Sequence, residues 1–509
     1  MRLVDIVQCW AEARSTRMRR VKSRTLAACL NSAGPDLPIV AAWLTGTLCQ
    51  GKIGIGFDVL TRVKRTSTPP AEYPSLDVTD VNDCFSTIAG LGGTESKTAR
   101  ATTLAAVYDR GTAAERLFLL ELLSGELRRA TQEGVLLDAI ARGADIPAAR
   151  VQRAYMVTGD LPLVAITAIR GGESALQHFH IELFRPLRPM LASPAETAAE
   201  ALILLDGDAF IDTKLDGVRV QIHRDGHQVR VYTRQLEDVT GKVPEVAQAA
   251  RSFPWDQFVL DGEALAMRRD GTPHPYAVSQ KRFGRDIDVG ALRIQHPLQL
   301  FVFDALLLDG EECIDWRASR RFAALDALPA ANKVDRIRVQ NADQAYAFYQ
   351  GALEAGHEGI IAKAPSGQYS AGARARSWLK IKPTHTVDLV VLAAEWGTGR
   401  RAGKLSNLHL AARDSDGGFI PLCETFRGLT DELLVWQTEA LQRLQVDQHA
   451  QRITVRPELV VEVAFNDVQL TTRHPSGVSL RFARVKRYRP DKSAAEADTL
   501  DAVKGLVSP

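Results

Sequence analysis

The sequence predicts a multidomain protein with an all-α N-terminal domain, an α+β middle domain and an all-β C-terminal domain. Residues 1–185 carry apolar residues at three- and four-residue spacing, which is typical of amphipathic helices. Residues 186–385 alternate β-rich runs with helix-like segments, as in an α+β fold of mostly antiparallel strands. Residues 386–509 have short strands separated by turns, a pattern that suits a small barrel such as an OB-fold.

The length and composition agree with several folded domains. A chain of 509 residues exceeds what one hydrophobic core usually organises, and a hydrophobic fraction of 45% supports more than one core. The net charge is only +2, so any basic surface for nucleic acid must be local. We expect no membrane partner, because no apolar stretch has membrane-spanning length and the N-terminus lacks a signal-peptide core.

The six cysteines lie far apart and form no Cys-x-x-Cys pair. This spacing argues against a structural zinc site and against a disulfide framework. It fits a reducing cytosol, so we expect a cytoplasmic protein.

Local patterns mark where two elements begin. Thr112-Ala-Ala-Glu115 is a capping box ahead of an apolar-rich helix. The stretch "FRPLRPMLASPAET", from Phe184 to Thr197, holds three prolines, which preclude a regular helix and mark the first domain boundary. Within it, Ser193-Pro194-Ala-Glu196 predicts the start of a capped helix.

Lys214 is the residue that we expect to carry the chemistry. It ends an apolar-rich run and precedes Asp216-Gly217 by two residues. A free lysine is a poor nucleophile because its pKa of about 10.4 keeps it protonated at pH 7, so desolvation or neighbouring cations must lower that pKa. Gly217 permits a tight turn and close backbone approach to a ligand, and Arg219 can bind a phosphate. Alone, these residues would more often form a surface hairpin turn.

Further segments follow Lys214 in order and favour the functional interpretation. They are Arg234 in "VYTRQ", Glu263 in "FVLDGEAL", Phe303 in "LFVFDALLLDG", Glu358 in "HEGIIAK", Lys380 and Lys382 in "WLKIKP", and the stretch "RFARVKRYRPDK" that ends at Lys492. In number, order and approximate spacing, this series resembles the nucleotidyltransferase motifs of the ATP-dependent DNA ligases. The resemblance implies an adenylation domain over residues 186–385 and an OB-fold domain over residues 386–509.

The resemblance also implies a reaction. Lys214 would attack the α-phosphate of ATP to give lysyl-AMP, the AMP would pass to the 5′-phosphate of a nick in duplex DNA, and the 3′-hydroxyl would displace it. Glu263 and Glu358 would hold Mg²⁺, which usually takes one or two protein carboxylates together with substrate phosphates. The nucleotide-binding residues that the resemblance implies are Asp212, Lys214, Arg219, Arg234, Glu263, Phe303, Arg376, Lys380, Lys382, Arg489 and Lys492.

Three of these assignments have a physical reason beside the resemblance. Phe303 falls at a strand-like position from which a phenyl ring could stack on adenine. Lys380 and Lys382 alternate around one residue, so on a strand both ammonium groups face one side. There they would neutralise charge on the α-phosphate in the transition state and could lower the pKa of Lys214.

A weaker resemblance covers the helical region. The segments "SGELRRATQEGVLLDAIA" and "TGDLPLVA" are similar to parts of the ligase DNA-binding domain. That similarity implies that Arg128, Arg129 and the loop "GGTESK" contact DNA phosphates, for which Arg, Lys, Ser and backbone N–H groups are the usual donors. Pro162 stands where a glycine is common in that domain.

Two other classes of protein share parts of this pattern. Capping enzymes and RNA ligases have a similar lysine motif and often the small barrel, but the helical region favours a clamp on duplex DNA. A non-catalytic nucleic-acid binding protein of the same fold would have lost Lys214 or the acidic pair, and all three are present.

The departures from the ligase pattern leave the reacting groups in place. Asp212, Leu215 and Ala483 stand where glutamate, tyrosine and proline are common. The four-cysteine cluster of the NAD-dependent ligases is missing, so ATP is the expected cofactor. We expect a monomer that acts on nicked duplex DNA.

Overall fold

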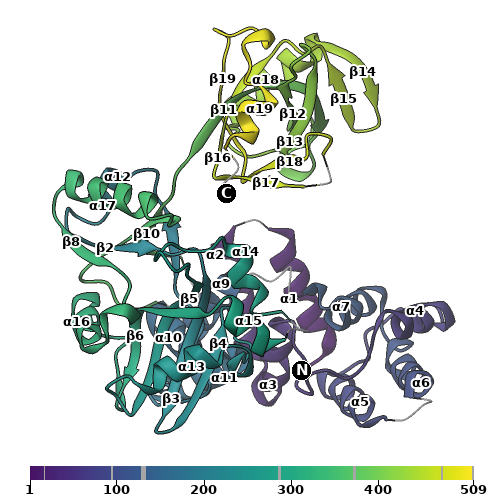
Figure 1. Cartoon of the computed structure of the whole chain (residues 1–509). Coiled ribbons are helices and arrows are strands. Elements are labelled where there is room, and N and C mark those ends of the chain that lie inside the picture. Colours follow the sequence, from purple (N-terminus) through teal and green to yellow (C-terminus); the bar gives the residue numbers. More distant parts are fainter. Residues whose placement is uncertain are drawn as a thin grey trace.

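The chain forms three parts that follow one another from the N-terminus to the C-terminus (Figure 1). The computed structural model describes residues 1–16, 18–92, 96–127, 133–284, 288–370, 374–471 and 474–506. The first part is helical, the second combines two sheets with helices, and the third is rich in strands. The predicted fold class is therefore confirmed.

One continuous hydrophobic core holds the helical region together. Its helices are α1 (Leu3–Ser15), α2 (Arg19–Ser32), α3 (Leu37–Leu44), α4 (Phe57–Thr66), α5 (Val78–Gly90), α6 (Ser96–Tyr108), α7 (Ala113–Ser124), α9 (Glu133–Gly143), α10 (Ala148–Thr158) and α11 (Leu161–Leu176). Trp43, Phe85 and Phe118 are fully buried in this core, and their rings pack together. The predicted capping box is confirmed, because Thr112 and Glu115 each accept a hydrogen bond from the other's backbone N–H.

The middle domain contains two five-stranded sheets. The first sheet has the order β1-β10-β9-β2-β8 and the second has the order β4-β3-β5-β6-β7. The strands are β1 (Leu191–Pro194), β2 (Ala209–Lys214), β3 (Val218–Asp225), β4 (Gln228–Thr233), β5 (Gln257–Ala266), β6 (Leu298–Leu308), β7 (Glu311–Glu312), β8 (Arg336–Val339), β9 (Gly359–Lys363) and β10 (Arg374–Ile381). The chain crosses from the first sheet to the second at the short segment between Lys214 and Val218, so this segment lies where the two sheets meet.

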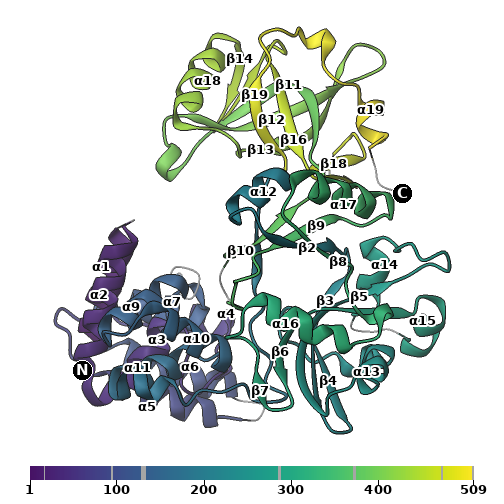
Figure 2. The same ribbon diagram turned by 90° about the vertical axis from the view of Figure 1, so that its left-hand side faces the viewer.

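Helices cover both sheets (Figure 2). They are α12 (Ala198–Leu204), α13 (Pro244–Arg251), α14 (Tyr276–Lys281), α15 (Val289–Gln295), α16 (Ala318–Ala324) and α17 (Ala342–Glu354). The helix start predicted at Ser193 is wrong. Ser193 and Pro194 lie in β1, which pairs with β10 in parallel, and α12 begins only after Thr197, whose hydroxyl accepts a hydrogen bond from the N–H of Glu200. Pairing with a distant strand outweighs the local capping pattern.

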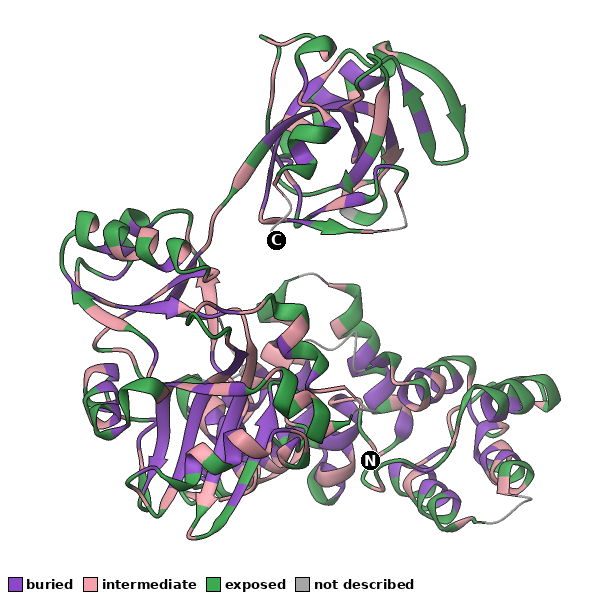
Figure 3. Ribbon diagram, viewed as in Figure 1, coloured by how far each residue is buried: buried purple, intermediate pink, exposed green. Residues whose placement is uncertain are grey.

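The C-terminal domain is built around the long strand β11 (His385–Trp396), which pairs with β12, β15 and β16. The other elements are β12 (Leu405–Arg413), β13 (Phe419–Thr425), α18 (Asp431–Arg443), β14 (Gln445–His449), β15 (Arg452–Val455), β16 (Val460–Phe465), β17 (Asp467–Leu470), β18 (Val478–Arg481), β19 (Arg484–Tyr488) and α19 (Leu500–Lys504). Its strands bury a core of their own, visible as the purple segments at the top of Figure 3. The predicted β-rich domain thus also carries helices.

The helical region packs directly against the middle domain. Met156 and Val157 of α10 share a buried cluster with Leu187 and Met190 of the connector and with apolar residues of β5 and β6. Arg153 strengthens this contact, since its guanidinium donates hydrogen bonds to carboxylates of the middle domain at 2.5 and 2.8 Å. The connector is therefore held between both parts of the protein.

Polar contacts join the C-terminal domain to the middle domain. Asn466 donates a hydrogen bond to the carbonyl of Pro383, and the ammonium of Lys486 lies 3.6 Å from the carboxylate of Glu196. The domain boundaries expected at residues 185 and 385 stay a prediction. Within the described ranges, no helix combines the length and the apolar composition that a membrane span requires.

His223 is fully buried in β3 and joins the connector to the second sheet. Its Nδ1 accepts a hydrogen bond from the N–H of Phe184 at 3.0 Å, and its Nε2 lies 2.9 Å from Oε1 of Gln221. The neutral imidazole, with its proton on Nε2, satisfies both contacts. Burial lowers the pKa of His223 to about 3.

We expect this histidine to make the protein less stable in acid. The folded-state pKa lies below the ordinary value of 6.5, so the unfolded chain binds a proton first as the pH falls. The stability present above pH 6.5 is then lost progressively, by about 2 kcal/mol at pH 5. Thermal unfolding of the full chain at pH 7 and pH 5 measures this loss. His223→Gln keeps polar atoms at the site but has no titrating group, so its Tm should fall less between pH 7 and pH 5 than the Tm of the wild type. An equal fall in both proteins would contradict the role of His223 in this pH dependence.

Candidate active site

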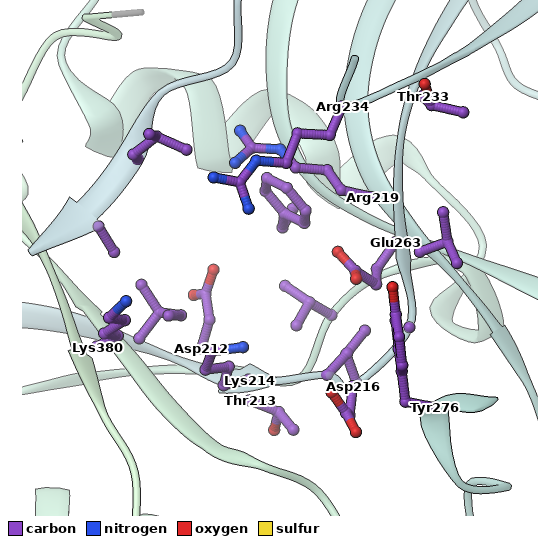
Figure 4. Close-up of a pocket in the computed structure, with 18 of the residues that line it drawn as sticks. Asp212, Thr213, Lys214, Asp216, Arg219, Thr233, Arg234, Glu263, Tyr276 and Lys380 are labelled. Atoms are coloured by element: carbon purple, nitrogen blue, oxygen red, sulfur yellow. The ribbon is translucent and has the colours of Figure 1, made fainter. Parts of the chain in front are cut away.

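A cavity of about 590 Å³ lies between the two sheets of the middle domain. Its walls come from β2, β3, β5 and β6 and from the strands β9 and β10 that carry the later motifs. The predicted residues that line it are Asp212, Lys214, Arg219, Arg234, Glu263, Phe303, Lys380 and Lys382. In Figure 4, Arg219 and Arg234 lie side by side on one side of the cavity, across from Asp212 and Lys214. The fold therefore brings together residues that are far apart in the sequence.

Lys214 is the last residue of β2, and its ammonium group donates a hydrogen bond to the carboxylate of Glu358. The same carboxylate forms an ion pair with Lys382. The backbone holds this arrangement, since the N–H of Glu358 donates to the carbonyl of Lys214 at 3.0 Å. Gly359 follows with a φ of +138°, and a Cβ there would lie 2.2 Å from the carbonyl oxygen of Ile381. Only glycine lets β9 approach β10 so closely beside the lysine.

The pKa of Lys214 is lowered from its ordinary value. Burial is the largest cause, and the guanidinium groups of Arg219 and Arg234 lower it further, whereas the carboxylates of Glu263 and Asp216 raise it. Contact with Glu358 favours the charged ammonium form. Burial therefore lowers the pKa of Lys214, while the contact with the Glu358 carboxylate opposes this effect.

Lys380 and Lys382 both face the cavity, as their alternation predicts, while Ile381 between them packs into the core of the first sheet. Burial lowers the pKa of Lys382 to about 8, and the charge of Lys214 contributes to this shift. A cluster of ammonium groups thus lies where the phosphates of a nucleotide would bind.

Arg219 and Glu263 lie opposite each other on the paired strands β3 and β5. Arg219 is fixed by Asp261, whose carboxylate accepts hydrogen bonds from Nε at 3.0 Å and from Nη2 at 2.5 Å. Burial raises the pKa of Glu263 to about 7. Gly217 is needed at the start of β3, because a Cβ there would lie 2.6 Å from the carbonyl oxygen of Ala264. Gly217 also lines the cavity, and its close approach to a ligand stays a prediction.

Phe303 is partly exposed in the cavity, beside the cations of Arg219 and Lys363. The ammonium of Lys363 is buried and lies 4.9 Å from the Phe303 ring centroid and 4.3 Å from that of Trp378. Phe303 also lies edge to face with Trp378 at 6.1 Å. An aromatic corner with a buried cation behind it therefore forms one wall of the cavity.

Asp212 is almost completely buried beneath this corner. Its carboxylate accepts hydrogen bonds from Arg336 at 2.5 and 2.7 Å and lies 2.6 Å from the ammonium of Lys363. Burial opposes ionisation of Asp212, but the two cations outweigh burial and lower its pKa. A contact between Asp212 and the nucleotide stays a prediction, and the structure adds that both oxygens already bind cations.

Three predicted nucleotide-binding residues do not line the cavity. Arg376 lies exposed in β10. Arg489 and Lys492 lie in the C-terminal domain, where both bind the carboxylate of Asp388. The predicted DNA contacts Arg128 and Arg129, together with residues 93–95 of the loop "GGTESK", fall outside the described residues.

The sequence interpretation missed Lys363, Trp378 and Tyr276, which also line the cavity. Lys363 ends the same strand that Glu358 precedes, and Ile361 and Lys363 both face the cavity at two-residue spacing. That alternation could have revealed the lysine. Trp378 precedes Lys380 by two residues and could have been found in the same way.

Glu263 and Glu358 are the carboxylates that the sequence resemblance assigns to a magnesium ion. Among the described residues, no group of three or more His, Cys, Asp or Glu side chains could hold a metal ion. Mg²⁺ usually takes one or two carboxylates and completes its shell with water and phosphates. Glu263 lines the cavity and Glu358 accepts a hydrogen bond from the ammonium of Lys214, so each supplies hard oxygen donors of this kind.

Comparison with known proteins identifies the family. Profiles described as "ATP dependent DNA ligase domain", "ATP dependent DNA ligase C terminal region" and "DNA ligase N terminus" match residues 189–382, 401–492 and 52–141. A protein of Mycolicibacterium paratuberculosis named "Probable DNA ligase" is 47% identical over 510 residues, covering 99% of this chain and 98% of the relative. The chain belongs to the ATP-dependent DNA ligase family. The resemblance found in the sequence is confirmed.

Other relatives agree with this ligase assignment. A "Probable DNA ligase" of Anaeromyxobacter sp. is 48% identical, again over 99% of this chain and 98% of its own length. The solved structure named "Pmar-Lig_Pre." covers 95% of this chain and 99% of its own, with a TM-score of 0.60 and 18% identity. That similarity shows the same fold. As an ATP-dependent DNA ligase, the enzyme is neither a capping-type transferase nor a non-catalytic binding protein.

Proposed function

We propose that this ligase seals nicks in duplex DNA through a lysyl-AMP intermediate on Lys214. The observation that carries the proposal is the position of Lys214, at the end of β2 in the cavity, with a pKa that burial lowers. An amine is a nucleophile only when neutral, so a site that lowers its pKa favours attack on the α-phosphate of ATP.

The residues around Lys214 bind and orient the nucleotide in this proposal. Phe303 stacks on the adenine, supported by the edge-to-face contact of Trp378. Lys380 and Lys382 stabilise the negative charge that develops on the transferred phosphoryl group. Arg219 and Arg234, which lie together across the cavity, contact the ribose, the phosphates or the nicked strand.

Glu358 links the metal to the nucleophile. We assign Mg²⁺ to Glu263 and Glu358, where it would neutralise phosphate charge during in-line transfer. Glu358 now binds the ammonium groups of Lys214 and Lys382, so a divalent cation would compete with both lysines for this carboxylate. Loss of its partner makes Lys214 easier to deprotonate, because an opposite charge no longer stabilises the ammonium form.

The test of this function is a joining reaction on a nicked duplex with a labelled 5′-phosphate. We expect sealing with ATP and Mg²⁺, no sealing when a chelator removes the metal, and covalent labelling of the protein by ATP but not by NAD or GTP. Labelling by NAD or GTP instead of ATP, or sealing that persists without a divalent ion, would overturn the proposal. We further expect the protein to be cytoplasmic. We also expect it to be a monomer, which size-exclusion chromatography with light scattering would check.

The helical region is the part that we propose to hold duplex DNA. If Arg128 and Arg129 each neutralise one phosphate, Arg128→Ala/Arg129→Ala should weaken nick binding and reduce the slope of log affinity against log salt by about two. Arg128→Lys/Arg129→Lys keeps both charges and is the matched control, for which we expect the wild-type slope. Self-adenylation should persist in both variants, and an unchanged slope in the alanine variant would refute these contacts.

A further inference from the structure

The side chain of Tyr369, in the loop between β9 and β10, has a buried hydroxyl that the proposed reaction does not use. This hydroxyl donates a hydrogen bond to Oδ2 of Asp261 at 2.7 Å. It accepts one from the N–H of Met190 at 3.0 Å and one from Nη2 of Arg219 at 3.3 Å. One donated and two accepted bonds use its whole capacity, so the hydroxyl has a fixed orientation.

The same contacts fix the guanidinium of Arg219. Asp261 binds Nε and Nη2, Tyr369 accepts a second bond from Nη2, and the carbonyl of Met190 accepts one from Nη1 at 2.7 Å. Within the described residues, these bonds engage four of the five N–H groups of this guanidinium, so one on Nη1 can donate to a ligand. The guanidinium of Arg219 is held over the ring of Phe303, with 5.3 Å between Cζ of Arg219 and the ring centroid.

Met190 connects this network to the helical region. Its N–H and carbonyl both bind groups of the network, and its side chain is fully buried in the cluster that contains Met156 and Val157 of α10. The N–H of Ser370, next to Tyr369, also lies 3.3 Å from the Met190 sulfur. The connector between the two domains is therefore a structural part of the nucleotide site.

We propose that Tyr369 is a positioning residue, which holds Arg219 against Phe303 and ties that position to the seating of the Met190 connector. Tyr369 does not touch the nucleotide in this proposal and acts only through Arg219, Asp261 and Met190. The inference rests on the proposed role of Arg219 in binding ATP or the nicked strand. It adds that the helical region influences nucleotide binding as well as DNA binding.

The test is Tyr369→Phe in the full chain, which keeps the ring that packs edge to face on Trp378. Loss of one hydrogen bond in a charged network should raise the KM for ATP in self-adenylation about tenfold, with a smaller change in kcat. Tyr346→Phe is the matched control, because Tyr346 is exposed on α17 and loses the same hydroxyl without an expected effect. Should Tyr369→Phe fail to fold, Asp261→Asn is the second variant. It weakens the bonds that Asp261 accepts from Arg219 and Tyr369, and its KM for ATP is compared with that of Tyr346→Phe in the same way.

A double-mutant comparison separates positioning from a general structural role. The ammonium of Arg219→Lys cannot make the forked contacts, so adding Tyr369→Phe to that variant should change the KM for ATP less than twofold. Equal effects of Tyr369→Phe in both backgrounds, or an unchanged KM in the single variant, would overturn the inference. If Arg219→Lys alone leaves ATP binding and nick sealing unchanged, the role of Arg219 itself is wrong, which is a different result.

Discussion

Lys214→Ala is expected to abolish both self-adenylation and the sealing of an ordinary nick with ATP. The side chain of Lys214 is the only one in this proposal that forms a bond to AMP, and an alanine supplies no nucleophile. Intact-mass spectrometry after incubation with ATP and Mg²⁺ should show no AMP adduct. Lys504→Ala, an exposed lysine on α19, is the matched control and should retain the adduct.

The fold of Lys214→Ala should survive, so the loss can be assigned to chemistry. Glu358 keeps its ion pair with Lys382 when Lys214 is removed, and the lysine lies at a cavity wall and not in the core. Thermal unfolding should therefore stay close to wild type. Joining of a chemically pre-adenylated nick should remain measurable, because that step needs no lysine nucleophile. An AMP adduct on Lys214→Ala would refute the assignment.

The positions of strands and helices could be predicted from the sequence wherever the periodicity of the side chains determines them. The β-rich runs expected between residues 186 and 385 include β3, β4, β5, β6 and β9, and the apolar-rich run that Lys214 ends is strand β2. Period-two alternation also placed Lys380 and Lys382 on one face. These features are local, so the sequence contains the information that determines them.

Features that depend on distant partners could not be predicted in the same way. Ser193 looks like a helix cap, and only the pairing of β1 with β10, from residue 374 onward, makes it part of a strand. Arg336 stands in an ordinary strand-like run, and nothing near it in the sequence indicates its bond to Asp212. The network of Asp261, Tyr369 and Met190 likewise joins three separate segments. The function was predicted from motif order, which does not require knowledge of these contacts.

Arg489→Ala and Lys492→Ala are expected to impair the first step of the reaction far more than the last. Both cations bind the same oxygen of Asp388, at 2.9 and 2.6 Å, and Arg489 also binds Asp491 at 2.7 Å. They belong to the C-terminal domain and do not line the cavity, so this domain must turn toward the cavity for them to reach ATP. Among the described residues, the domain contacts Pro383 through one hydrogen bond and Glu196 through an exposed ion pair, which are compatible with such a movement.

The leaving group explains why lysyl-AMP formation should be impaired more than the joining of a pre-adenylated nick. Pyrophosphate departs only when lysyl-AMP forms, and a cation that stabilises its charge in a closed, water-poor cleft contributes to that step alone. Each variant should slow lysyl-AMP formation by about two orders of magnitude, the usual cost of losing one such donor. Joining of a pre-adenylated nick should proceed at near wild-type rate, because no pyrophosphate leaves. Single-turnover assays with the two substrates measure both rates.

Arg487→Ala is the control for lost charge, because Arg487 lies in β19, which ends one residue before Arg489. Arg487 is exposed and binds Glu462 at 2.7 Å, two residues from Arg489, so its removal changes the net charge of the domain equally. We expect normal rates on both substrates for this variant. Equal losses on both substrates for Arg489→Ala would show that the motif does not act on the first step specifically. No loss on either would mean that Arg489, Asp491 and Lys492 form only an ion-paired surface segment around Asp388.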